Sequence, residues 1–239
     1  MDEFRLIISD LVMSFMWVCS GALIKILVYH VLGWGFQAKG EALKVSLYVV
    51  VMFFFAWFGK VSRGGSYNPL SVLSQAISGR FSDFVFTLFG RIPAQVIGSI
   101  IGVRLIIATF PEVGKGPRLN VDIHHGALVE GLLTLSIVMI SQFLRNGHSG
   151  FFMKTWISSL SKLSLHIIGS DLTGGCMNPA SVFGWAFARG DHITKEHWFV
   201  YWLAPVEATL LGVWIFSLLS KPQKQKRQEK QPDKTIKAD

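Results

Sequence analysis

Two Asn-Pro pairs, far apart in the chain, constrain the fold more than any other sequence feature. The two motifs are Asn68, Pro69 and Leu70, and Asn178, Pro179 and Ala180. Asn caps a helix through its side-chain oxygen, and Pro suits the first helical position because no hydrogen-bonded N–H is needed there. Each motif follows a Gly-rich connection, and we expect half-helices over residues 68–79 and 178–189. A helix of about 11 residues is roughly 16 Å long, about half of a ~30 Å hydrocarbon core.

Composition and apolar runs indicate a polytopic membrane protein rather than a soluble domain. Of the 239 residues, 51% are hydrophobic and 13% are aromatic, and the charges gather in short connecting stretches. The runs that can form spanning helices cover residues 6–32, 43–58, 84–107, 126–144, 151–168 and 198–219. We therefore expect an all-α membrane protein with six transmembrane helices and two re-entrant half-helices.

The order of these segments is the same in both halves of the chain. Each half reads span, span, half-helix, span, which makes residues 6–110 a first repeat and residues 126–219 a second, joined by a loop over 111–125. Because three spans per half is an odd number, the second repeat enters the membrane inverted, and the half-helices meet at the midplane. An acid followed four residues later by a hydroxyl occurs in the leading span of both halves, at Asp10 and at Glu130.

Charged residues predict the orientation of the chain. Much of the net charge of +8 lies in residues 220–239, which we expect to be a disordered cytoplasmic tail, with residues 1–5 on the same side. A nucleic-acid-binding protein would place its basic patch among soluble elements, so no nucleic-acid partner is expected. Lys25, Arg91, Arg104 and Lys162 lie within apolar runs. Basic side chains near the ends of such runs can snorkel to the interface, and Arg91 is expected at the entry to the third span.

The Gly-rich connections before the two motifs require a polar environment at membrane depth, and they predict a water-accessible path. Each Asn is expected to cap its helix through oxygen and to present amide N–H groups to this path. Two positive helix ends that face each other repel cations, which predicts passive conduction of small uncharged molecules with protons held back. Asp10 and Glu130 are expected to hold the loops by accepting backbone N–H groups, the alternative being a proton relay.

The pattern resembles the aquaporin family over about residues 6–219. Further agreement is found at Thr173, Gly174, Gly184, Ala186, Tyr201, Trp202 and Pro205. The short N-terminus, the basic tail and Leu70 are most similar to the plant small basic intrinsic proteins with an Asn-Pro-Leu first motif. The resemblance implies a homotetramer with one pore per subunit, located in the endoplasmic reticulum membrane.

The resemblance also assigns the outer constriction of the pore to four residues, carried over by their spacing from the motifs. They are Tyr48, His166, Gly175 and Ser181, with Ser46 as an alternative to the first because the intervening loop can contain a gap. Water-selective members usually carry Arg where this chain has Ser181. We therefore expect a wider constriction, and an exclusion of cations that depends more heavily on the Asn pair.

The function predicted from the sequence is a water channel, with membrane lipid and water or another small neutral solute as its partners. No cofactor, metal or enzymatic reaction is expected. His124 and His125 precede Glu130, but the order is not His-Glu-x-x-His and no third ligand is evident. Cys176 lacks an identifiable base, and near a pore mouth it would be open to mercurials.

Two alternative functions also fit the sequence. Ser181 and Gly175 leave room at the constriction, so the main solute could be hydrogen peroxide or glycerol. Inverted repeats and broken helices also occur in secondary transporters, although the sequence supplies no clear ion site or titrating acid at the midplane.

Overall fold

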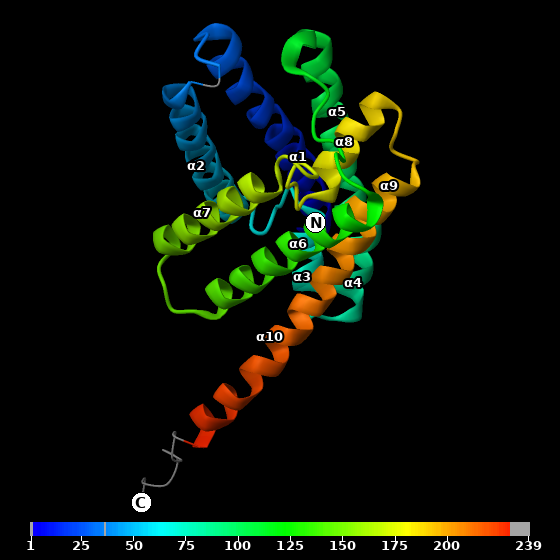
Figure 1. Ribbon diagram of the computed structural model, residues 1–239. Helices are drawn as coiled ribbons and strands as arrows, with labels where there is room; N and C mark the ends of the chain where they lie inside the picture. Colours follow the sequence, from blue (N-terminus) through cyan, green and yellow to red (C-terminus); the bar gives the residue numbers. More distant parts are fainter. Residues whose placement is uncertain (1, 36, 230–239) are drawn as a thin grey trace, which may run out of the picture.

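The computed structural model describes residues 2–35 and 37–229, and all regular structure within them is helical (Figure 1). The helices of the first half are α1 (Asp2–Lys25), α2 (Ala38–Val61), α3 (Pro69–Ala76), α4 (Phe81–Phe86) and α5 (Ile92–Thr109). Those of the second half are α6 (Ile123–Asn146), α7 (Phe151–Gly169), α8 (Pro179–Arg189), α9 (Lys195–Trp198) and α10 (Ala204–Glu229). Short π-helical segments cover Ile26–Val31, Thr87–Arg91 and Phe199–Leu203, and a 3-10 turn covers Pro111–Val113.

Within the described residues, five helical stretches are long and apolar enough to cross a membrane. They are Asp2–Val31, Ala38–Val61, Phe81–Thr109, Ile123–Asn146 and Lys195–Ser220. The other expected span is α7, a helix of 19 residues whose two lysines and four serines lower its mean hydropathy. Two of its polar residues, Lys162 and His166, line an internal cavity rather than the outer surface of the bundle. The expected all-α membrane fold is confirmed.

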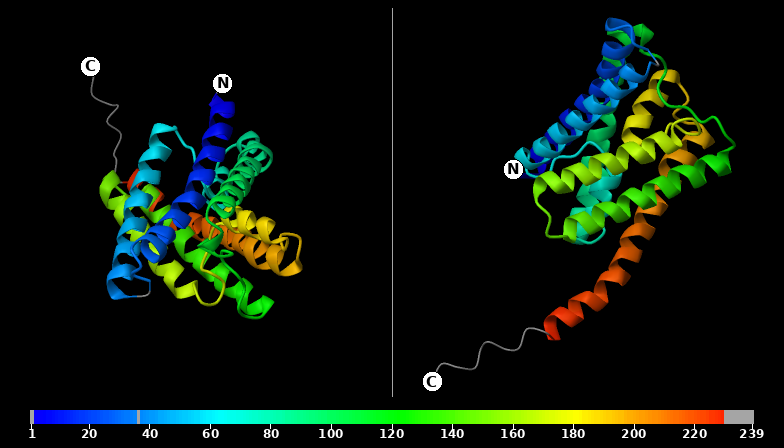
Figure 2. Two further views of the ribbon diagram at one scale, coloured as in Figure 1. Left: turned by 90° about the horizontal axis from the view of Figure 1, so that it is seen from above. Right: turned by 60° about the vertical axis from the view of Figure 1, so that its left-hand side comes forward.

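The two half-helices begin at the predicted prolines. Asn68 and Asn178 are the N-cap residues of α3 and α8, and both have extended backbone conformations. The N-terminal ends of α3 and α8 lie in the middle of the bundle, and the two helices run toward opposite ends of it (Figures 1 and 2). α3 ends at Ala76, before the expected residue 79. α8 ends at Arg189, where Gly190 adopts the left-handed conformation that closes many helices.

Glycines allow α5 to pack closely against two neighbouring helices, α1 and α8. A Cβ atom at Gly98 of α5 would overlap the backbone carbonyl of Leu11 in α1, and one at Gly184 of α8 would overlap Ser99 of α5. Only glycine fits at such contacts without a shift of the backbone, which is how small residues serve helix interfaces in membranes. The second half-helix is therefore fixed against the first repeat.

Two further boundaries differ from the sequence expectations. The third span begins at Phe81, so Arg91 lies inside it, within a π-helical turn, and not at its entry. α10 continues to Glu229 and projects beyond the other helices (Figures 1 and 2), so the first part of the tail expected to be disordered is helical. Lys, Arg, Gln and Glu are good helix formers, which explains why a polar tail can extend a helix. The rest of the expected tail, residues 230–239, lies outside the described residues.

Candidate functional site

The Asn residues of the two motifs cap their half-helices through their side-chain oxygens. Oδ1 of Asn68 accepts a hydrogen bond from the Leu70 N–H at 2.9 Å, and Oδ1 of Asn178 accepts one from the Ser181 N–H at 3.3 Å. Because the oxygen of each amide is used in this way, its Nδ2 group must point away from the helix axis. The helix ends and the Nδ2 donors thus gather in the middle of the bundle.

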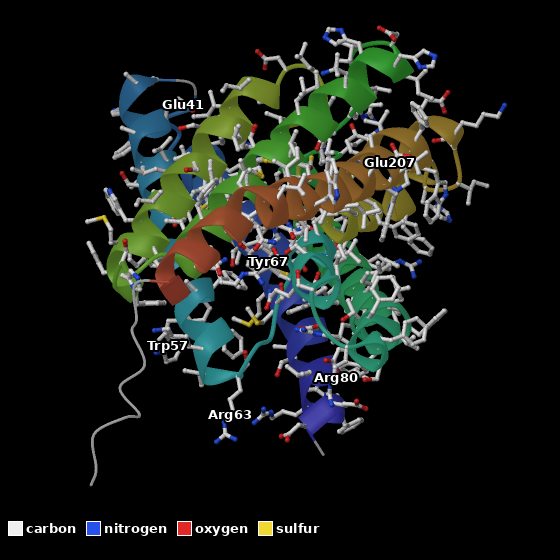
Figure 3. All side chains as sticks on the ribbon, turned by 90° about the horizontal axis from the view of Figure 1, so that it is seen from below. Glu41, Trp57, Arg63, Tyr67, Arg80 and Glu207 are labelled. Carbon is white, nitrogen blue, oxygen red and sulfur yellow. The ribbon has the colours of Figure 1, made fainter. Side chains whose placement is uncertain are left out.

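Each Nδ2 group donates to the backbone of the opposite motif. Asn68 Nδ2 lies 2.7 Å from the carbonyl oxygen of Met177, and Asn178 Nδ2 lies 3.2 Å from the carbonyl oxygen of Tyr67. The two acceptors are the residues immediately before the two asparagines, so the bonds are related by the same inverted symmetry as the repeats. Tyr67 lies near the centre of the bundle when it is seen from below (Figure 3). Each amide keeps a second N–H for a solute.

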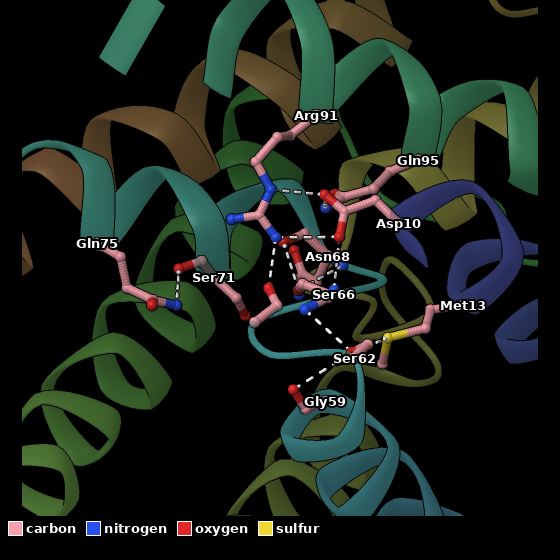
Figure 4. Close-up of polar contacts among 12 residues, drawn as sticks. Asp10, Met13, Gly59, Ser62, Ser66, Asn68, Ser71, Gln75, Arg91 and Gln95 are labelled. Atoms are coloured by element: carbon pink, nitrogen blue, oxygen red, sulfur yellow. Dashed lines mark hydrogen bonds and ion pairs between the residues drawn. The ribbon is translucent and has the colours of Figure 1, made fainter. Parts of the chain in front are cut away.

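Asp10 supports the first re-entrant loop. Its carboxylate is fully buried and accepts a hydrogen bond from the Ser66 N–H at 2.7 Å (Figure 4). The same carboxylate pairs with the Arg91 guanidinium, with Nε 2.7 Å from Oδ2, and accepts from Gln95 Nε2 at 3.1 Å. The guanidinium also donates to the Gly64 carbonyl, so one ion pair ties α1, the third span and the loop together.

Glu130 supports the second loop without an ion pair in the described part of the chain. Its carboxylate accepts from the Thr173 hydroxyl at 2.6 Å, from the Cys176 N–H at 2.9 Å and from the Met177 N–H at 3.0 Å. Met177 is a buried non-glycine residue with a φ of 46°, a conformation that the surroundings must impose. Glu130 holds its N–H while Asn68 holds its carbonyl, so the strained residue is fixed from both sides.

Two of the three π-helical segments in the described residues lie at corresponding places, in the third span of each repeat, and each supplies a donor to a re-entrant loop. Arg91, in the turn at Thr87–Arg91, donates to Gly64. Tyr201, in the turn at Phe199–Leu203, donates through its hydroxyl to the Thr173 carbonyl at 2.8 Å. A π-turn widens a helix locally and frequently occurs at functional sites. The donor thus comes from the same place in each repeat, but it is a guanidinium group in the first and a phenol hydroxyl in the second.

A cavity of about 870 Å³ includes both asparagines and all four residues assigned to the constriction. His166 Nδ1 lies 3.2 Å from the Gly175 carbonyl oxygen, which fixes the ring against the second loop. Tyr48 lines the cavity, whereas the alternative Ser46 is exposed, is absent from the lining and bonds its own helix at the Ala42 carbonyl. Leu70 and Ser181 also line this space.

The sequence reasoning missed the charge of the cavity lining. Five basic residues line the cavity, namely Lys25, Lys44, Arg118, Arg145 and Lys162, and in the described part of the chain no Asp or Glu does. Lys162 could have been found from its position, because residues four apart share a helix face and Lys162 precedes the constriction residue His166 by four. The pairing of Arg91 with Asp10 carried no local signal.

Neither a metal site nor a disulfide is found in the described residues. Residues 2–35 and 37–220 contain no group of three or more His, Cys, Asp or Glu side chains that could hold a metal ion. Cys19 and Cys176 are both free thiols, and Cys176 lines the cavity.

Comparisons with known proteins agree on one family. The family model described as major intrinsic protein matches residues 1–216. The chain is 57% identical to a probable aquaporin SIP2-1 of Arabidopsis thaliana, over 93% of this chain and 94% of that protein. It is 56% identical to aquaporin SIP2-1 of Oryza sativa subsp. japonica, over 92% and 89%, and 33% identical to aquaporin SIP1-1 of Arabidopsis thaliana, over 93% and 96%.

Proposed function

The chain belongs to the major intrinsic protein family, the family of the aquaporins, and we propose on this premise that it conducts water and other small uncharged solutes passively. It is an integral membrane channel protein and not an enzyme. The observation that carries the proposal is the Asn pair, since both amides line one cavity at the N-termini of two opposed half-helices. Cations are repelled by the helix dipoles at this point, while a solute oxygen can accept from the two amides.

The support of the loops is part of this mechanism. Donors favour a water molecule over bulk solvent only if their positions are fixed before the molecule arrives. Asp10 and Glu130 accept N–H groups of the two loops, and we assign them this structural role instead of a proton relay. A water that accepts from both amides turns its own hydrogens outward, so it cannot pass a proton along the file.

The size of the permitted solute is assigned to the outer group of cavity residues. Tyr48 and His166 supply the large side chains of this group, and Gly175 and Ser181 supply the small ones. Because the lining residue at 181 is small, hydrogen peroxide and glycerol belong in any test of the solute range. The endoplasmic reticulum location, the cytoplasmic termini and the homotetramer are proposed here from the family resemblance.

The proposal is tested by stopped-flow light scattering of proteoliposomes that contain the purified full-length chain. We expect an osmotic shock to drive water flux several-fold faster than in empty liposomes, in proportion to the gradient and without any ion gradient. Hydrogen peroxide and glycerol are tested as the driving solutes in parallel. Flux that saturates at a slow turnover, or that requires an ion gradient, would identify a secondary transporter and contradict the channel.

Cys176 gives a second test of the pore assignment. Its thiol is partly buried and lines the cavity, so a mercurial bound to it should obstruct the path and abolish most of the water flux. Cys176→Ser should resist the mercurial. Cys19 is the matched control, because it is not among the cavity residues and its Sγ lies 3.9 Å from the Gly102 carbonyl oxygen. If Cys19→Ser, and not Cys176→Ser, protects the flux, the cavity is not the path.

A further inference from the structure

The cavity carries a positive charge that its constriction residues do not explain. Ser181 stands where water-selective relatives have a fixed cation, yet the described lining holds five basic residues and no acid. Lys44 is neutralised, because its Nζ lies 2.6 Å from Glu41 Oε2. The other four basic lining residues form no ion pair among residues 2–35 and 37–220. Of these, Lys25 interacts with the constriction residue His166, and Lys162 contacts Tyr67 beside the Asn pair.

Lys162 lies close to the Asn pair. Its Nζ is 3.5 Å from the Tyr67 hydroxyl and 5.8 Å from the centre of the Tyr67 ring. The ammonium group contacts the side chain of Tyr67, and the backbone carbonyl of the same residue accepts the hydrogen bond from Asn178 Nδ2. Tyr67 is itself held by stacking on Trp17, with ring centres 4.1 Å apart. The position of the charge is therefore set by a rigid aromatic support.

Lys25 lies near the constriction residue His166. It is the last residue of α1, lines the cavity and is near enough to His166 to interact with it electrostatically. α7 carries both His166 and Lys162 on one face, one helical turn apart. The two ammonium groups thus lie at different places in the cavity, Lys25 near the constriction residue His166 and Lys162 near Tyr67.

We propose that Lys25 and Lys162 act together with the Asn pair to exclude cations and protons from this pore, supplying the positive charge that Ser181 does not provide. The proposal rests on the channel function proposed above and adds the residues that determine its selectivity. Two ammonium groups in a partly apolar cavity raise the energy of a passing cation much more than they would in bulk water. An uncharged solute carries no net charge for them to repel, and it passes.

The test compares Lys162→Met, Lys25→Met and the double variant with the wild-type full-length chain in proteoliposomes. Water flux is measured by light scattering, potassium flux by an entrapped potassium dye and proton flux by an entrapped pH dye. We expect the ratio of potassium to water permeability to rise about tenfold in each single variant and further in the double variant. Lys154→Met is the matched control, because Lys154 lies on α7 but does not line the cavity, and its ratio should not change.

A rescue experiment separates charge from shape. Lys162→Arg should keep potassium out, and Ser181→Arg added to the double variant should restore the exclusion. Wild-type liposomes without water flux would refute the channel function itself. Wild-type water flux together with a double variant that is as tight to potassium and protons as the wild type would overturn the role of the two lysines. If Lys162→Met fails to assemble, Lys25→Met, which lies on another helix, is used instead. A ratio of potassium to water permeability equal to that of the wild type would then overturn the proposal.

Discussion

Replacing Asn178 by Asp is expected to reduce water permeability by about tenfold or more and to raise the leak of potassium. The Asp side chain has no N–H to donate, so the Tyr67 carbonyl loses its partner at 3.2 Å and faces a carboxylate instead. The loss of this hydrogen bond and of the Asn178 donor to the passing water raises the barrier to permeation, and about 1.4 kcal/mol of barrier is a tenfold change in rate. The new negative charge also attracts cations to the point where two helix dipoles repel them. Stopped-flow light scattering and a potassium dye measure the two effects.

The matched control for this change is Asn146→Asp. Asn146 is the last residue of α6, and its Nδ2 donates to the Gln142 carbonyl within the same helix. It is not among the residues that line the cavity. We expect its water permeability to stay at the wild-type value. Equal water flux and equal potassium leak in Asn178→Asp and Asn146→Asp would refute the role assigned to the Asn pair.

Local signals account for the parts of the fold that the sequence predicted. Helix capping depends on a few adjacent residues, so the starts of α3 and α8 follow directly from the Asn-Pro pairs. Apolar runs depend on composition alone, and the helices extend beyond the predicted runs by several residues because polar residues also continue a helix. The end of α3 was misplaced, because no proline or charged residue stops the helix at Ala76.

The partners of buried charges depend on distant parts of the chain, and the sequence could not predict them. A basic residue within an apolar run can snorkel, line a cavity or pair with an acid, and these cases look alike in one sequence. Arg91 pairs with Asp10, 81 residues away, and Lys162 faces the Tyr67 ring, 95 residues away. Only the packing of α1, α7 and the first loop decides between the three cases. The sequence therefore assigns cation exclusion to the Asn pair, because it does not show that basic side chains line the same cavity.

The asymmetry between the two loops explains why one of them depends on a single ion pair. Glu130 is satisfied by one hydroxyl and two N–H groups, all from the loop that it holds. Asp10 receives only one N–H from its loop, that of Ser66, and is otherwise held by Arg91 and Gln95 of the third span. The first loop is therefore attached to the bundle mainly through Arg91, which binds both the carboxylate and the loop carbonyl at Gly64.

For this reason we expect Arg91→Met to be among the most destabilising single substitutions in the protein. The change leaves the fully buried Asp10 carboxylate without its counter-charge and frees the Gly64 carbonyl. Removing one partner of a buried ion pair typically costs about 3–5 kcal/mol. The midpoint of thermal unfolding in detergent and the yield of folded protein should both fall, and the water flux per folded molecule should fall as the first loop loosens.

Arg80→Met is the matched control for this substitution. Arg80 forms an ion pair with Asp83 at 3.0 Å, but its side chain is 83% exposed, and water replaces the partner of an exposed charge. Its unfolding midpoint should therefore equal that of the wild type. Asp10→Asn combined with Arg91→Met should recover part of the lost stability, because the buried charge is then removed together with its partner. If Arg91→Met unfolds at the same temperature as Arg80→Met, Arg91 does not hold the loop, and Gln95 and Ser66 alone must satisfy the Asp10 carboxylate.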